Sequence, residues 1–147
     1  MKGGIFQLPR AIAEGMIAQA QAGWPEEICG LLAADGTGRV VEWLPVPNVA
    51  ADKQITYRMA PMHQLLAFER MDEEGWTLAA IYHSHPQSAA YPSPKDRHDA
   101  FDPYDGVPLY PGTPYLILSL ADRDAPAIRA FLLPTRDEVV EMRVEIV

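Results

Sequence analysis

A nine-residue segment, Thr77 to His85, constrains the fold of this chain more than any other feature. Its residues are apolar almost without interruption and become polar only at the C-terminal end. A strand that is buried on both faces of a sheet has this composition, whereas a strand with one solvated face would alternate between apolar and polar residues. The segment therefore predicts a central strand that carries a polar site at its tip.

The segments around this strand predict a mixture of helices and strands. Residues 9–23 and 61–74 place apolar side chains at spacings of three and four and end at a glycine, which is typical of amphipathic helices. The turn signal at 35–38 predicts a β-hairpin between residues 28–34 and 39–44. Further strands are expected at 55–59, 115–121, 127–133 and 139–146, the last at a sheet edge, with a short helix at 93–101 and an irregular loop at 102–114. We expect an α/β fold in which a mixed β-sheet is flanked by helices.

Composition limits the classes of protein to which this chain can belong. Its 147 residues are expected to form one domain, residues 1–147. The net charge of −8, with scattered Lys and Arg residues, argues against nucleic acid or an anionic membrane as a partner. Cys29 is the single cysteine, which excludes an internal disulfide, and residues 1–9 lack the apolar run of a signal peptide. We expect a cytoplasmic protein, and the sequence leaves open whether it forms a homodimer.

His83 and His85 stand at the polar tip of the predicted central strand. Positions i and i+2 of a strand face the same side with Cα atoms roughly 7 Å apart, so both imidazoles can reach one metal ion at about 2.0–2.1 Å. Unpaired imidazoles at the end of a buried strand would cost free energy, and a metal ion removes that cost. Asp96 follows as a candidate third ligand. Three protein ligands leave one position of a tetrahedral zinc site for water, which distinguishes a catalytic zinc from a structural one.

Ser93 and Asp96 also have an interpretation without a metal. Ser93 suits the N-cap of a helix, Pro94 its first position and Asp96 its first turn. This alternative explains both residues and stays open at the level of the residues themselves. Of the other two histidines, His63 is expected on a helix surface in contact with solvent. His98 is only two residues from Asp96, close enough to be mistaken for a ligand, but it is expected on a different side of the helix.

A hydrolytic zinc site also needs a group that carries protons to and from the reacting atoms. Glu26 and Glu27 offer carboxylates at the start of an apolar strand. Taken alone, two glutamates after a proline more often form a solvated turn.

Two spaced motifs together resemble the JAMM (MPN-plus) zinc metalloprotease family. They are Pro25-x-Glu27-x-x-Gly30 and His83-x-His85-Pro86-x5-Pro92-Ser93-x-x-Asp96. The resemblance implies the JAMM/MPN (cytidine-deaminase-like) fold and one Zn²⁺ per chain, held by His83, His85 and Asp96. It also implies that Glu27 is the general base and acid, that Ser93 stabilises the oxyanion, and that Glu26 faces away.

The same resemblance implies a substrate class. Members of the short stand-alone bacterial type are similar to sulfur-carrier-protein peptidases, so we expect hydrolysis after the C-terminal Gly-Gly of a small ubiquitin-like or sulfur-carrier protein, with release of cysteine or of a lysine-linked target. The irregular segments 45–59 and 102–114 are expected to grip this partner, the second either as a lid or as a solvated insertion. Two alternatives stay open: a non-catalytic MPN-type module that binds a ubiquitin-like modifier, and a zinc peptidase that acts on cell-wall or phage peptides.

Overall fold

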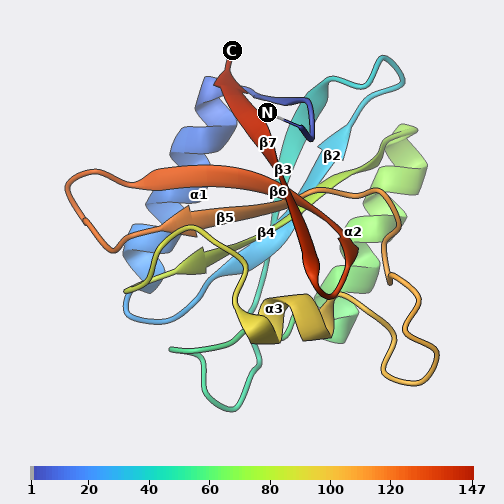
Figure 1. Cartoon of the computed structure of the whole chain (residues 1–147). Coiled ribbons are helices and arrows are strands. Elements are labelled where there is room, and N and C mark those ends of the chain that lie inside the picture. The colour runs from blue at the N-terminus through green and yellow to red at the C-terminus, as the bar shows by residue number, and fades with distance from the viewer. Residues whose placement is uncertain (1) are drawn as a thin grey trace.

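The computed structural model describes residues 2–147 and shows a 7-stranded sheet with helices on both faces (Figure 1). The strand order is β1-β7-β6-β5-β4-β2-β3. Strands β1 and β7 pair in parallel, as do β4 and β5, and the other neighbours are antiparallel. The elements are β1 (Ile5–Leu8), α1 (Arg10–Gly23), β2 (Cys29–Ala34), β3 (Val40–Val46), α2 (Pro61–Glu74), β4 (Thr77–His85), α3 (Pro94–Asp99), β5 (Tyr115–Ser119), β6 (Ala127–Thr135) and β7 (Glu138–Ile146). The α/β class expected from the sequence is confirmed.

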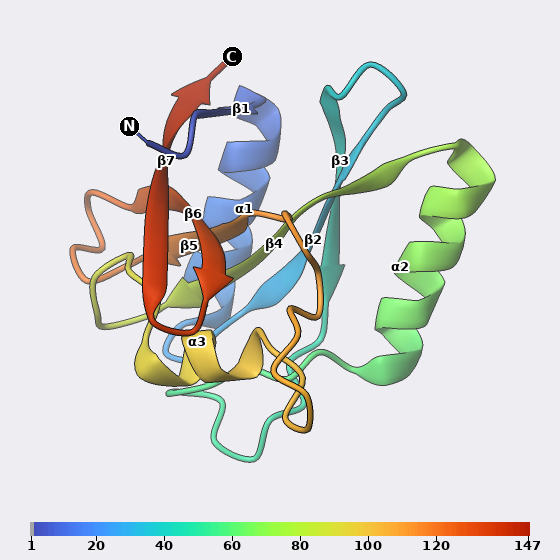
Figure 2. The ribbon, with the colours of Figure 1, turned by 45° about the vertical axis from the view of Figure 1, so that its right-hand side comes forward.

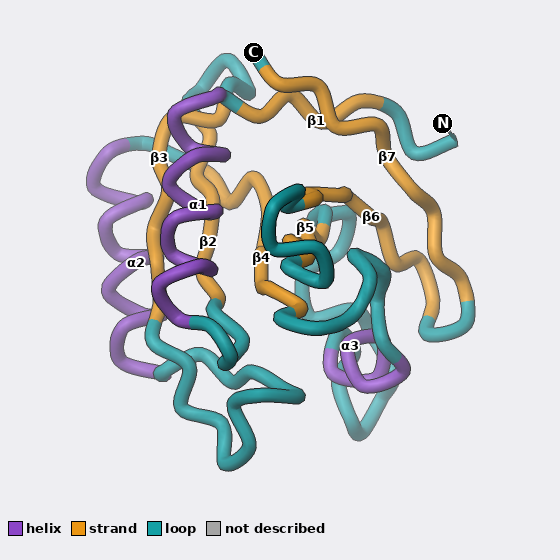
Figure 3. Tube along the Cα trace, turned by 90° about the vertical axis from the view of Figure 1, so that its left-hand side faces the viewer, coloured by secondary structure: helices purple, strands orange, loops and turns teal. Residues whose placement is uncertain are grey.

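Strand β4 lies between β2 and β5, as expected of a strand buried on both faces. Its side chains alternate between two cores: Ala80 and Tyr82 pack in the core that includes α1, and Ile81 packs in the core that includes α2. Figure 2 and Figure 3 show α1 and α2 on opposite faces of this part of the sheet. The strand tip is therefore covered from both sides, and the last six residues of β4 are all buried.

The two long helices form where the apolar spacing predicted them. In α1, Met16 and Ala20 are buried, and Ile12 and Ile17 pack partly against the same core. Helix α2 ends at Gly75, which adopts a left-handed conformation with φ of 74° that glycine tolerates without strain. Among the helices of residues 2–147, none combines the length and the apolar composition that a bilayer crossing requires.

The prediction of a strand at residues 55–59 is wrong. Only an isolated bridge between Asn48 and Met59 forms there. The side chain of Asn48 binds the carbonyl oxygen of Thr56 and the backbone N–H of Arg58, so these groups are satisfied locally. A side chain that takes over backbone hydrogen bonds in this way competes with a strand ladder.

The predicted edge position of the last strand is also wrong, although the strand itself is confirmed. β7 lies between β6 and β1, and the edges of the sheet are β1 and β3. Strand β1, a strand of four residues whose register pairs Ile5 with Arg143, was not predicted from the sequence. Because the two partners lie at opposite ends of the chain, no local pattern announces their pairing.

Candidate metal centre

Three side chains expected from the sequence meet at the C-terminal end of β4. His83 and His85 come from the strand, and Asp96 comes from the first turn of α3. The two Nε2 atoms are 3.1 Å apart, and the Asp96 Oδ2 atom lies 3.1 Å from His83 Nε2 and 3.0 Å from His85 Nε2. In a tetrahedral site with bonds of about 2.0–2.1 Å, ligand atoms are separated by about 3.3 Å. The group is therefore close to the size that one metal ion requires, and it is able to hold one.

Hydrogen bonding to the far side of His85 supports a cation at this point. The Nδ1 atom of His85 lies 2.8 Å from the carbonyl oxygen of Ala89, which can only accept, so Nδ1 carries a proton. The Nε2 atom of a neutral His85 is then an acceptor that faces the carboxylate oxygen of Asp96. Two acceptors at this distance repel each other unless a proton or a metal ion lies between them. The donor set, two imidazoles and a carboxylate, suits zinc.

The electrostatics of the group also favour positive charge. Burial works against the imidazolium form of His85, but the hydrogen bonds to Asp96 and to the Ala89 carbonyl outweigh it and raise the pKa of His85. Burial would raise the pKa of Asp96, but the two imidazoles and the Ser93 N–H stabilise its carboxylate and hold that pKa far below its usual range. Asp96 is therefore an anion in a largely buried pocket, which attracts a cation.

For Asp96, the two roles that the sequence left as alternatives are compatible in the structure. The Ser93 hydroxyl accepts a hydrogen bond from the backbone N–H of Asp96 at 3.0 Å, and Asp96 Oδ2 accepts one from the backbone N–H of Ser93 at 2.9 Å. This reciprocal pair is a capping box at the start of α3. The cap thus fixes the carboxylate whose Oδ2 atom faces the two histidines, so capping and metal binding are compatible.

Glu27 lies two residues before strand β2 and reaches the same corner. Cys29 pairs with His83, and the backbone N–H of Ser84 donates to the carbonyl of Ile28, so the chain just before β2 runs beside the tip of β4. The Glu27 carboxyl is close enough to His85 and Asp96 to interact with their charges. The residue is 5% exposed, whereas Glu26 is exposed. The sequence had left a solvated turn as the ordinary interpretation of this pair, and for Glu27 the structure contradicts it.

The environment of the Glu27 carboxyl raises its pKa. Its Oε1 atom is buried without a hydrogen-bond partner among residues 2–147. Burial is the main cause and raises the pKa of Glu27 to about 7. The positive charge of His85 lowers this pKa, and the negative charge of Asp96 raises it. A carboxyl with this pKa can both take up and release a proton near neutral pH, as acid–base catalysis requires.

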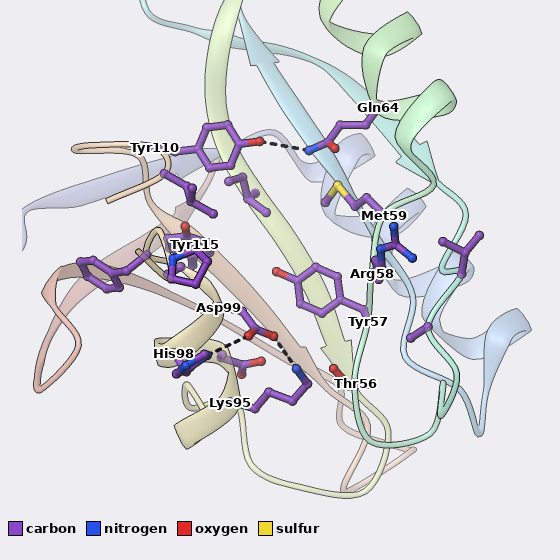
Figure 4. A pocket seen from close by; sticks show the side chains of 18 of the residues that line it. Thr56, Tyr57, Arg58, Met59, Gln64, Lys95, His98, Asp99, Tyr110 and Tyr115 are labelled. Carbon is purple, nitrogen blue, oxygen red and sulfur yellow. Dashed lines mark hydrogen bonds and ion pairs between the residues drawn. The ribbon is translucent and has the colours of Figure 1, made fainter. Parts of the chain in front are cut away.

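A cleft of about 850 Å³ lies beside this corner and includes a residue that the sequence analysis missed. The ring of Tyr57 stacks on the His83 imidazole, with 4.5 Å between ring centroids and 25° between planes. Figure 4 shows Tyr57 in the middle of the cleft, between Lys95 on one side and the hydrogen-bonded pair Gln64 and Tyr110 on the other. Both irregular segments expected beside the site, 45–59 and 102–114, contribute to its lining. A lone tyrosine in an irregular segment carries no sequence signal that would mark it.

The remaining histidines lie outside the metal group. His98 is on the exposed side of α3, 3.2 Å from Asp99, and His63 is exposed on α2. Neither belongs to the group of side chains in residues 2–147 that could hold an ion.

Solved structures define the class of this fold. The solution structure of a protein from Desulfitobacterium hafniense is similar to this chain with a TM-score of 0.76 and 34% identity, over 97% of this chain and 92% of that one. A JAB1/MPN domain protein from Archaeoglobus fulgidus shares the fold with a TM-score of 0.56 and 18% identity, over 95% and 98% of the two chains. The fold is that of a JAB/MPN domain.

Sequence comparison then assigns the family. The profile described as prokaryotic homologs of the JAB domain matches residues 9–133, and the chain belongs to this family. It is 34% identical over 135 residues to the probable TtuB-protein conjugate cleaving protease of Thermus thermophilus, which covers 92% of this chain and 80% of the relative. It is 38% identical over 96 residues to the desampylase of Haloferax volcanii and 34% identical over 94 residues to the CysO-cysteine peptidase of Mycobacterium tuberculosis, and it spans 63% of each. The chain is accordingly a peptidase of the JAMM type, as the motifs predicted.

Proposed function

We propose that this protein is a zinc-dependent peptidase that hydrolyses the bond after the C-terminal Gly-Gly of a small ubiquitin-like or sulfur-carrier protein, with residues 1–147 acting as one catalytic domain. The observation that carries the proposal is the buried carboxyl of Glu27, whose Oε1 atom has no hydrogen-bond partner among residues 2–147 and which interacts with the charges of His85 and Asp96 in the His-His-Asp group. The names of the relatives support the substrate class, because they refer to conjugates of TtuB and to CysO-cysteine.

The proposed chemistry divides among five side chains. His83, His85 and Asp96 would hold one zinc ion, which supplies Lewis acidity toward water and toward the scissile carbonyl. Glu27 takes the proton of the attacking water and returns it to the departing amine, a role that suits a buried carboxyl beside the His-His-Asp group.

Ser93 is proposed to stabilise the oxyanion. Its Oγ atom accepts the N–H of Asp96, and this bond uses a lone pair, so the hydroxyl proton stays available for donation. A donor held by a helix cap is fixed before the reaction begins, which is the condition for effective stabilisation of a developing charge.

The cleft suits a narrow, extended tail. Its walls come from the 48–58 segment, the start of α2 and α3, and its lining includes Tyr57, Tyr110 and Tyr115. Glycine leaves the backbone of a substrate free to approach such walls closely and to form backbone hydrogen bonds. We therefore place the Gly-Gly tail in this cleft, with the cysteine or lysine leaving group beyond it.

The test compares two neighbouring glutamates on two defined substrates. Purified protein is incubated with a Gly-Gly–cysteine adduct and a Gly-Gly–lysine adduct of a ubiquitin-like protein, and the products are identified by mass spectrometry. We expect cleavage by the wild type, none after chelation of zinc, none by Glu27→Gln, and near wild-type rates for Glu26→Gln.

Each alternative predicts a different outcome. A binding module would retain both adducts without cutting them, and a cell-wall peptidase would cut a cell-wall peptide while leaving both adducts intact. Equal losses in the two glutamate variants would show that the general base has been assigned to the wrong residue.

A further inference from the structure

One side chain holds together the two ends, or neck, of the loop formed by residues 48–58. This loop lies beside the candidate site. Asn48, the only asparagine in the sequence, follows β3 and makes four hydrogen bonds. Its Oδ1 atom accepts from the backbone N–H groups of Ala50 at 2.9 Å and Arg58 at 3.0 Å. Its Nδ2 atom donates to the carbonyl oxygens of Glu27 at 2.9 Å and Thr56 at 3.1 Å. Three of these bonds close the loop, and the fourth ties it to Glu27, two residues before β2.

The loop that Asn48 closes, residues 48–58, encloses the backbone of Glu27 from both sides. The Glu27 carbonyl receives the Asn48 amide, and the Glu27 N–H donates to the carbonyl of Lys53 near the loop tip at 2.7 Å. Glu27 precedes the first residue of β2 and lies outside the regular ladder. The position of its backbone is therefore set by this loop as well as by the sheet.

The same loop carries the ring that contacts the metal group. Tyr57 lies between Thr56 and Arg58, whose backbone groups are both bound by Asn48, and it stacks on His83. Figure 4 shows these three consecutive residues along one side of the cleft. Any movement of the loop neck would shift the Tyr57 ring relative to His83 and the Glu27 backbone relative to His85.

We propose that Asn48 is a positioning residue for the reaction, which fixes the Glu27 backbone and the Tyr57 ring against the two histidines in one arrangement. The expected effect of Asn48 on turnover rests on the proposed function. The expected effect of Asn48 on the positions of Glu27 and Tyr57 rests on the structure alone. A residue that orients catalytic groups affects turnover more than substrate affinity, because a displacement of about 1 Å can cost on the order of 10² in rate.

The competing explanation is that Asn48 contributes only to the stability of the fold. A matched control for this alternative lies at the turn of the β2–β3 hairpin. Asp35 closes the β2–β3 turn with a comparable set of bonds: its Oδ1 atom accepts from the backbone N–H groups of Thr37 and Arg39 and from the Thr37 hydroxyl. Asp35→Ala therefore removes a loop-closing side chain of similar kind, but at the end of β2 away from Glu27.

The first arm of the experiment is NMR of the zinc-loaded protein and requires no substrate. With four histidines in the chain, the imidazole proton spectrum is sparse, and a Tyr57→Leu variant identifies the His83 signals that the stacked ring shields. In Asn48→Ala we expect the His83 signals to move toward their Tyr57→Leu positions, whereas in Asp35→Ala they stay at the wild-type positions. Unmoved His83 signals in a folded Asn48→Ala variant would overturn the positioning role.

The second arm compares kinetics and metal content on the Gly-Gly adduct that the wild type cleaves. Asn48→Ala should lower kcat on the order of 10²-fold with little change in KM and an unchanged zinc content. Asp35→Ala should leave kcat near wild type. Equal kcat in the two variants would assign Asn48 to stability alone.

A second substitution keeps the test decisive where Asn48→Ala does not fold. Asn48→Asp retains the two bonds that the side chain accepts but can no longer donate to the carbonyl oxygens of Glu27 and Thr56. Its kcat should remain low up to the plateau of the pH profile, and its His83 signals should move toward their Tyr57→Leu positions, because the bond to the Thr56 carbonyl beside Tyr57 is lost as well. A wild-type kcat on that plateau would contradict the tie to Glu27. If no adduct is cleaved by any form, the proposed function fails while the NMR result still decides the geometric inference.

Discussion

Gly30 and Tyr82 pair directly across strands β2 and β4, and the phenol group of Tyr82 fills the place of a side chain at position 30. A Cβ atom there would collide with the Tyr82 hydroxyl and lie 2.6 Å from the carbonyl oxygen of Leu44. The hydroxyl cannot swing away freely, because it donates to Gln19 Oε1 at 2.6 Å and accepts from Trp43 Nε1 at 2.7 Å. The glycine of the first motif is thus a packing requirement three residues from Glu27.

Gly30→Ala is expected to destabilise the protein. Overpacking of this kind costs about 1–3 kcal/mol in the free energy of unfolding, measured by denaturant titration. Gly36→Ala is the matched control, since a Cβ atom at Gly36 meets nothing within 4 Å. A Gly30→Ala variant as stable as Gly36→Ala would show that Tyr82 repacks without cost.

Removal of one metal-facing side chain is expected to abolish zinc binding. His85→Ala and Asp96→Asn should each lower the zinc content far below one ion per chain, because two remaining ligands hold the ion weakly. His98→Ala should keep full zinc, since its side chain is 67% exposed and is not part of the group that could hold an ion. Elemental analysis of the purified variants measures this directly, and equal zinc in His85→Ala and His98→Ala would refute the ligand assignment.

The pKa of Glu27 predicts a pH dependence of stability in the chelator-treated protein. Burial raises this pKa from 4.5 to about 7, so between these values the folded state holds a proton that the unfolded chain has released. The free energy of unfolding that Glu27 contributes is therefore highest below about 4.5 and declines as the pH rises toward about 7. The difference between wild type and Glu27→Gln, measured over this range, isolates the effect from His85 and Asp96. A bound zinc ion favours the carboxylate and should move the decline to lower pH.

Two substitutions of Ser93 separate oxyanion stabilisation from helix capping. Ser93→Ala should lower kcat by about 10²–10³-fold if the hydroxyl stabilises the oxyanion, and it should cost about 0.5–2 kcal/mol in stability because the cap is lost. Ser93→Gly removes the same hydroxyl, but glycine is tolerated at an N-cap at a cost of only a few tenths of a kcal/mol. Equal kinetic losses with unequal melting temperatures would support both roles. Unchanged kcat in Ser93→Gly would leave capping alone.

The elements that the sequence predicted well depend on local patterns. The hairpin at Asp35, the two long helices and the buried strand before His83 each follow from residues within one segment. The residues of the candidate site could also be predicted from the sequence, because a strand and a helix cap determine where His83, His85 and Asp96 point.

The features that the sequence did not predict depend on contacts between distant segments. The edge assignment of β7 failed because β1, from the other end of the chain, covers it. The strand at 55–59 failed because one side chain, Asn48, takes the backbone groups that a ladder would use. The stacking of Tyr57 on His83 is a contact of the same long-range kind, which apolar spacing cannot anticipate.

The bulges of β2 separate the end of the strand near Cys29 from the end at the hairpin turn. The turn end can tolerate inserted residues, whereas the Cys29 end cannot. The register is regular from Cys29 to Leu32 and shifts only between Leu32 and Ala34, next to the hairpin turn. Extra residues at the turn can be absorbed there without moving the pairing of Cys29 with His83. The 35–38 turn is thus a natural attachment point for an inserted epitope or a surface-immobilisation tag, which would tether the protein by the end of this hairpin away from Glu27 and leave the cleft free for binding measurements.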